Sequence, residues 1–373
     1  MIELINNDLN ITFPEHKAQL HKRICAWIDE KLAGATSQEK TMLPASRGDL
    51  FAKFRSCFPE VRATISFHRT LRIPDDGRDY PLPPGLGKFP VLHTDDFAEV
   101  PETWKKRGGV MLPMHRGEAL YLGFNADFPM AIKVGAGGIC AISGEKWTST
   151  INATPQNYVV LPYQQWLDGF RVSEEIIRQF VAVPMGKGMT VEHQLTGEET
   201  WGGLQLQAMP LGLDYYWLSE LRQNLEERWW QLVNPPQRSG AARAAVASIG
   251  FGAGGRMKQE IFDDMYRFDA WESLQTSRCF VHLCIADDWQ RLTGSQPPQK
   301  PLTAQDYTKA GLPWFDYETG QPALTGETIL TTIKSVGTLI AEKTGLEMAE
   351  NSTVTPTNIV KLKPRTTGVV REF

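Results

Sequence analysis

Two motifs in the last third of the sequence carry residue types with well-known chemistry. The first, Gly250-Phe-Gly-Ala-Gly-Gly255, fits G-x-G-x-x-G and precedes Met257 and Ile261 at helical spacing. In a dinucleotide-binding unit such glycines let a pyrophosphate rest on a helix N-terminus, and an acidic residue follows about 20 residues on. The candidates Asp287 and Asp288 come much later. We therefore interpret the glycines as a hairpin or loop.

The second motif is Cys279-Phe-Val-His282-Leu-Cys284, because thiolates and imidazoles are zinc ligands. On a strand, His282 and Cys284 share one face while Cys279 points to the other. No second C-x-x-C or H-x-x-H pair accompanies them in the sequence. The motif is typical of a buried strand, and no metal ligands are assigned.

Acidic side chains crowd the same region, where paired carboxylates could perform acid–base work or bind a hard cation. They lie near expected turns and beside arginines, so we interpret them as solvated faces and ion pairs. The acidic residues are Glu260, Asp263, Asp264, Asp269, Asp287 and Asp288.

Two loops, 161–170 and 196–203, combine tryptophans, carboxylates and glycines. Loops held by a rigid sheet often form binding sites. One interpretation is an aromatic and carboxylate-lined pocket, and the other is a pair of corner-turning loops with capping carboxylates. The candidate binding residues are His115, Trp166, Asp168, Glu198, Trp201 and His282.

The elements that must position these residues are mainly strands. Apolar and polar residues alternate from residue 61 onward, which predicts strands at short intervals, with one or two helical turns at 172–178. Gly135–Gly138 is expected to form a hairpin loop. Helices are expected at 15–33, 214–233 and 328–343. The expected strands are 62–73, 109–114, 119–124, 131–134, 139–142, 158–161, 179–183, 203–209, 245–251 and 278–286.

This pattern predicts a β-rich α+β fold, with a central antiparallel sandwich or barrel-like domain, flanking helices and a smaller C-terminal α+β unit. The expected parts are a helical segment 1–60, a central domain 61–233, a unit 246–345 and a flexible tail 346–373.

Composition limits the classes of partner. The 39 basic and 43 acidic side chains give a net charge of −4, which does not indicate nucleic acid. No apolar run approaches the ~20 residues of a membrane span. Five scattered cysteines argue against a disulfide framework, so a cytoplasmic location is expected. Eleven tryptophans indicate aromatic-rich cores or an aromatic partner surface.

Several stretches between about residues 60 and 320 resemble a family of bacterial and fungal proteins, some of whose fungal members are joined to a ubiquitin-like module. The resemblance implies family membership and an intracellular setting, but no activity or cofactor. The stretches are Lys106-Arg-Gly-Gly-Val-Met-Leu-Pro-Met-His115, Pro162–Phe170, Arg178-Gln-Phe-Val-Ala-Val-Pro184, Thr196-Gly-Glu-Glu199, Arg278-Cys-Phe-Val-His282 and Ala310-Gly-Leu-Pro-Trp-Phe-Asp-Tyr317.

Two functional hypotheses follow. The first is a non-enzymatic binding or assembly protein, whose partner is a protein or a second copy of the chain. The second is an enzyme with a site assembled from distant loops, using His115, Asp168, Glu198 or His282 and in one version a metal. The sequence names no cofactor.

Overall fold

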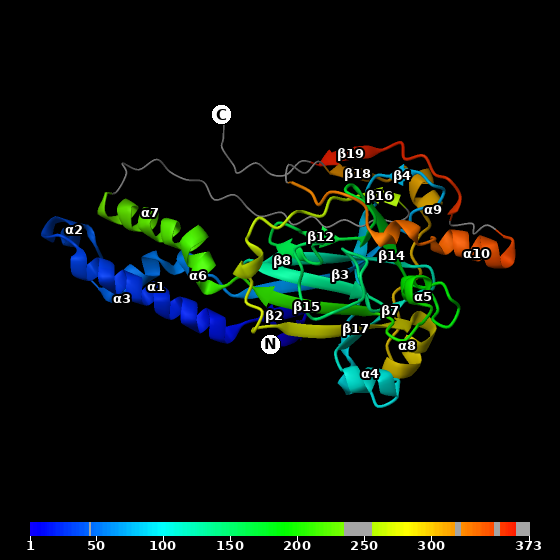
Figure 1. Cartoon of the computed structure of the whole chain (residues 1–373), viewed down its shortest axis with the longest axis horizontal. Helices are drawn as coiled ribbons and strands as arrows, with labels where there is room; N and C mark the ends of the chain where they lie inside the picture. The colour runs from blue at the N-terminus through cyan, green and yellow to red at the C-terminus, as the bar shows by residue number, and fades with distance from the viewer. Residues whose placement is uncertain (45, 235–255, 318–321, 347–350, 363–373) are drawn as a thin grey trace.

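The computed structural model describes residues 1–44, 46–234, 256–317, 322–346 and 351–362 (Figure 1). Its middle is built from two large sheets. The first contains the path β1 (Ile2–Ile5), β2 (Asp8–Thr12), β3 (Arg62–Thr70), β8 (Ala119–Ala126), β14 (Ile176–Val181), β16 (Arg256–Lys258) and β4 (Asp79–Tyr80). Three short strands join it at the side, β5 (Gly85–Lys88) on β3, β12 (Trp166–Leu167) on β8 and β13 (Gly169–Arg171) on β14.

The second sheet has β17 (Ser277–Ile285) near its centre, paired antiparallel with β15 (Leu204–Pro210) and parallel with β7 (Val110–Met114). Strands from both sides of the expected boundary at residues 233–246 therefore lie in the same sheets. The order of strands in the second sheet is β10 (Ile139–Cys140), β9 (Met130–Ala136), β15 (Leu204–Pro210), β17 (Ser277–Ile285), β7 (Val110–Met114) and β6 (Leu92–His93), with β11 (Val159–Leu161) paired to β9.

The two sheets face each other across one core. Alternation along β3 turns Ala63, Ile65 and Phe67 inward, and Val134 and Leu206 of the second sheet belong to the same buried cluster. The β-rich α+β class is confirmed, and no barrel closes within the described ranges. The predicted glycine hairpin is also confirmed, because Gly137 and Gly138 join β9 to β10 with φ of 60° and 70°.

Helices flank the sheets. α1 (Pro14–Gly34) and α7 (Arg222–Val233) extend to one side together with α2 (Ser37–Met42) and α3 (Arg47–Lys53), as Figure 1 shows. Trp27 of α1 meets Trp229 of α7 edge to face, with ring centroids 6.3 Å apart. The other helices are α4 (Glu102–Arg107), α5 (Val191–Thr196), α6 (Leu213–Tyr216), α8 (Ala286–Thr293), α9 (Ala304–Lys309) and α10 (Val336–Thr344). No helix in the described part of the chain is both long and apolar enough to cross a membrane.

Two stretches with helical spacing are extended in the structure. The predicted turns at 172–178 are wrong, because the Val172 and Ser173 N–H groups donate to the Ile176 carbonyl and β14 begins there. Met257 lies on β16 rather than on a helix. Here backbone partners on neighbouring strands outweigh side-chain spacing, since β16 pairs with β14 and with β4.

The chain ends also differ from expectation. Residues 1–60 are not wholly helical, because β1 and β2 form a hairpin around Asn6 and Asn7, whose φ angles are 53° and 65°. The expected tail contains β19 (Ile359–Leu362), which is ordered by parallel pairing with β18 (Trp314–Tyr317). The expected helix 328–343 divides into a 3₁₀ turn, Ile329–Thr332, and α10. The strand expected at 245–251 and the Gly250–Gly255 motif lie outside the described residues.

Candidate functional site

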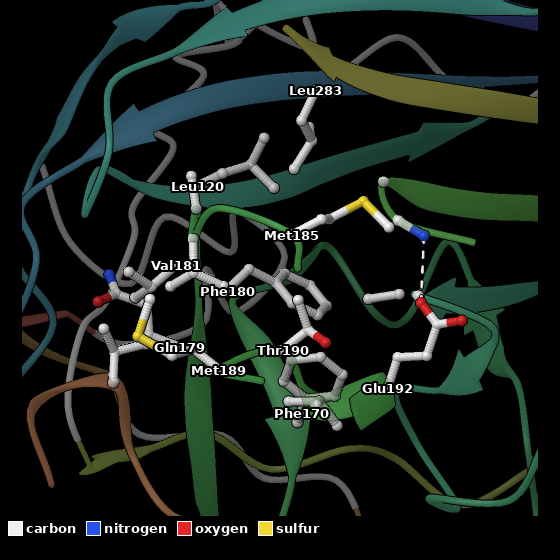
Figure 2. A pocket seen from close by; sticks show the side chains of 18 of the residues that line it. Leu120, Phe170, Gln179, Phe180, Val181, Met185, Met189, Thr190, Glu192 and Leu283 are labelled. Carbon is white, nitrogen blue, oxygen red and sulfur yellow. Dashed lines mark hydrogen bonds between the residues drawn. The ribbon is translucent and has the colours of Figure 1, made fainter. Parts of the chain in front are cut away.

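A cavity of about 360 Å³ lies between the ends of the two sheets. β14 and the segment after it form one wall, and the end of β17 forms another. The loop 184–203 and the segment Ile333–Val336 border it on the other sides. Figure 2 shows Leu120, Phe170, Phe180, Met185 and Met189 gathered around the space. Its apolar lining also includes Met114, Val181, Val183, Val191, Leu204, Leu283, Ile285 and Ile333.

The apolar wall follows from strand geometry. Phe170 on β13 and Phe180 on β14 belong to the main core, and their rings meet edge to face at 5.0 Å. Leu120 comes from β8, the next strand, whose register pairs it with Phe180. Three adjacent strands thus present large side chains to the same space. Residues of the loop 184–203 line the remaining side of this space.

Glu192 of α5 shapes that loop. Its side chain is only 3% exposed, and its carboxylate accepts hydrogen bonds from the N–H groups of Thr200 (2.8 Å) and Trp201 (2.9 Å). The Gly202 N–H donates to the other oxygen at 3.2 Å. With its oxygens occupied by backbone donors, this carboxylate fixes the loop and is not a free base.

Glu199 fixes the other half of the same loop. It accepts hydrogen bonds from the Thr190 hydroxyl at 2.8 Å and from the Gly186 N–H. Burial pushes the pKa of the Glu199 carboxyl upward, but these hydrogen bonds outweigh it and lower the pKa below its ordinary value. Two carboxylates inside one loop therefore hold the cover of the cavity in place.

The polar end of the cavity contains Arg178, which lies on β14. Its Nη1 is 3.8 Å from Asp75 Oδ1, an ion pair longer than a hydrogen bond. Its Nε is buried and has no hydrogen-bond partner. Burial lowers the pKa of the Arg178 guanidinium, and the nearby Arg256 acts in the same direction.

Neighbouring polar groups of the lining are already paired. Gln179 donates to the Leu71 carbonyl at 2.9 Å. Gln194 exchanges two hydrogen bonds with the backbone of Lys334, at 3.0 and 2.6 Å. The Lys334 ammonium lies 2.7 Å from Glu342. These contacts hold the cavity wall together.

Two of the predicted site residues, Trp201 and His282, line the cavity. His282 stacks on Trp104, with ring centroids 4.7 Å apart, and its Nε2 donates to the Gly108 carbonyl at 3.0 Å. Burial lowers the pKa of His282, so the imidazole is neutral at pH 7. Trp201 lies under the Arg107 guanidinium, 5.1 Å from the ring centroid. These rings form an aromatic rim.

Trp166 and Asp168 lie elsewhere, beneath the C-terminal elements. Trp166 packs edge to face on Tyr317 at 5.0 Å. Asp168 is 0% exposed, and neither carboxyl oxygen has a hydrogen-bond partner. Burial raises the pKa of the Asp168 carboxyl well above its ordinary value, and the neighbouring Trp166 indole lowers it by less.

The other two predicted residues are also separate from the cavity. His115 lies in the turn after β7, and its Nε2 donates to the Pro298 carbonyl at 2.7 Å. Glu198 is exposed in the loop 184–203. The structure therefore brings together Trp201 and His282 among the six candidates, and the sequence prediction did not include Arg178, Glu192 or the apolar lining.

The cysteine and histidine motif lies on β17 as predicted. Cys279 faces the main core and Cys284 faces a small cluster with Trp289. Burial raises the pKa of the Cys279 thiol to about 12 and that of Cys284 to about 11, so both are protonated. Within the described ranges, no three His, Cys, Asp or Glu side chains are grouped closely enough to hold a metal ion.

The chain matches no protein-family model, no curated protein and no solved structure. The family resemblance noted in the sequence therefore stays a prediction.

Proposed function

We propose that this chain is a non-enzymatic binding protein whose cavity holds a small, mostly apolar ligand. The observation that supports this is the cavity of about 360 Å³, walled by Leu120, Phe170 and Phe180 and covered by an ordered loop. Ligand sites in proteins are typically concave, largely apolar and about 300–1,000 Å³ in volume.

The size of the ligand follows from this volume. A volume of about 360 Å³ lies near the lower end of the ~300–1,000 Å³ range of ligand pockets, so the cavity suits a small ligand. Met185 and Met189, which cover the space, have flexible side chains that adapt to a ligand of irregular shape. A straight or lightly branched chain of about ten carbons fits these limits.

The alternative of a loop-assembled enzyme site lacks comparable support. His115, Asp168 and Glu198 are not among the cavity-lining residues, and the Glu192 carboxylate is occupied by backbone donors. A protein partner or self-association stays a prediction of the sequence.

Calorimetry with decanol and decanoate tests the proposal, using a variant that fills the cavity. Val183 lines the cavity just beyond the end of β14, so Val183→Trp places a bulky ring in the space. Val360→Trp is the matched control, since Val360 is 39% exposed on β19. We expect the wild type and V360W to bind at least one of the two ligands, and V183W to lose at least tenfold in affinity. Failure of the wild-type protein to bind either ligand would overturn the proposal.

A further inference from the structure

We propose that the ligand is an aliphatic carboxylate, whose head group is held by the Arg178 guanidinium. This inference rests on the proposed function, because it assigns the chemistry of the ligand that the cavity takes. It depends on three features of the polar end of the cavity, which are an unused donor, a loosely paired guanidinium charge and an adjoining apolar wall.

The unused donor is Arg178 Nε. Among the described side chains that line the cavity, Arg178 Nε is the only buried nitrogen or oxygen that has no hydrogen-bond partner. Buried polar groups are nearly always paired, so an orphan donor at a cavity wall calls for an acceptor from outside the chain. A guanidinium presents parallel N–H groups in a planar fork, which matches the two oxygens of a carboxylate.

The charge of the Arg178 guanidinium is only loosely paired. Arg178 of β14 stands directly opposite Arg256 of β16 in the strand register. Like charges opposite each other destabilise a sheet unless an anion compensates them. Arg256 has a close partner in Asp79, at 3.0 Å, whereas the Arg178 contact to Asp75 is 3.8 Å long. Arg178 is thus the less neutralised of the two.

The apolar wall begins beside the charge. In the register of β13 and β14, Phe170 pairs with Arg178, and Phe180 follows two residues later on the same strand. Side chains two residues apart on a strand share a face, so the guanidinium lies beside the two rings on the same face of the sheet. A ligand with its carboxylate at Arg178 would therefore place its chain along Phe170 and Phe180, toward Leu120 and Leu283 (Figure 2).

The experiment compares decanoate with decanol by calorimetry at pH 7.5, where the two ligands share a ten-carbon chain and differ in the charged head. We expect the wild-type protein to bind decanoate at least about tenfold more tightly, the typical effect of a hydrogen bond to a charged group. Arg178→Gln should remove this preference by weakening decanoate binding more than decanol binding. Arg62→Gln is the matched control, because Arg62 is a strand arginine paired with Asp127 outside the cavity.

Each outcome decides one question. Equal binding of decanol and decanoate by the wild-type protein would overturn the carboxylate assignment and leave the proposed cavity function standing. Binding of neither ligand would overturn the proposed function itself. Equal loss of both ligands in R178Q, with unchanged thermal stability, would show that Arg178 only shapes the wall and would overturn its role as the anchor. If R178Q does not fold, the wild-type comparison still decides, together with Arg178→Lys, which should retain part of the preference.

Discussion

The cavity and the C-terminal cluster are both lined by aromatic and aliphatic side chains of the first sheet, but they differ in how they are filled. The C-terminal cluster comprises Leu71, Ile73, Tyr80, Leu82, Ile177, Met257, Ala304, Tyr307, Trp314 and Val354. Trp314 is 0% exposed there, and the ring centroids of Tyr80 and Tyr307 each lie 6.1 Å from that of Trp314. In the cavity, the sheets and the loop 184–203 leave space. Residue type alone therefore does not separate the two regions, since Trp166 packs against the filled cluster whereas Trp201 and His282 line the cavity.

The largest expected effect concerns the filled region. Trp314→Ala should lower the free energy of unfolding by about 3–5 kcal/mol, because it leaves a large void in a closed apolar cluster. Urea denaturation measures this. Trp230→Ala is the control, since Trp230 is 62% exposed on α7, and it should change stability by less than about 0.5 kcal/mol. Equal effects of the two substitutions would contradict the contrast between a filled cluster and an open cavity.

The second prediction uses the buried carboxyl in the same region. At pH values well below 4, Asp168 is protonated in both the folded and unfolded chain. As pH rises toward its raised folded pKa, only the unfolded chain releases the proton, so the wild-type protein loses stability. Asp168→Asn has no such proton. As the pH rises, the free energy of unfolding of the variant should therefore increase relative to that of the wild type, by up to about 1.4 kcal/mol for each pH unit.

Thermal unfolding of both proteins from pH 4 to 8 measures the difference in stability between them. Other titrating groups contribute equally to both proteins, so their effects cancel in this difference. A constant difference across this range would mean that Asp168 is ionised in the folded protein, and that it has a partner or water that neutralises the cost of burial.

The smallest effect concerns the cover of the cavity. Glu192→Gln replaces one acceptor oxygen by a donor facing the N–H groups of Thr200, Trp201 and Gly202, and should cost about 1–3 kcal/mol. Hydrogen exchange should rise in residues 184–203 more than in the sheets. Glu198→Gln is the control, because Glu198 is an exposed glutamate of the same loop. This substitution should leave the hydrogen exchange unchanged. Unaltered exchange in E192Q would show that the loop is ordered without this carboxylate.

The strands were predicted well where alternation and turn residues agree. β8 and β15 were located to within two residues of their observed ends, and Gly137–Gly138 marked a hairpin. The Asn6–Asn7 turn carries a similar signal, since asparagine tolerates positive φ, but the sequence prediction included only helices there. Met257 shows the limit of spacing arguments, because its strand is fixed by pairing with β14, a partner that lies about 80 residues earlier in the sequence.

The site was harder to predict than the fold. Trp201 and His282 were found at the rim by residue type. From the sequence, Phe170, Phe180 and Leu120 could not be distinguished from ordinary core residues. An inward-facing apolar residue on a strand gives the same sequence pattern whether it packs against another side chain or lines a cavity. Arg178 became notable only through its register opposite Arg256, which depends on how distant strands pair.

The position of β17 has a consequence for the order in which the chain is synthesised. β17 separates β15 from β7, yet it is translated after both of them. Until Ser277–Ile285 leaves the ribosome, the facing edges of β15 and β7 are without their shared neighbour and can pair with another nascent chain. Release of this one segment completes the second sheet, so a chain terminated before residue 277 would be prone to aggregate, although it already contains most of the cavity lining.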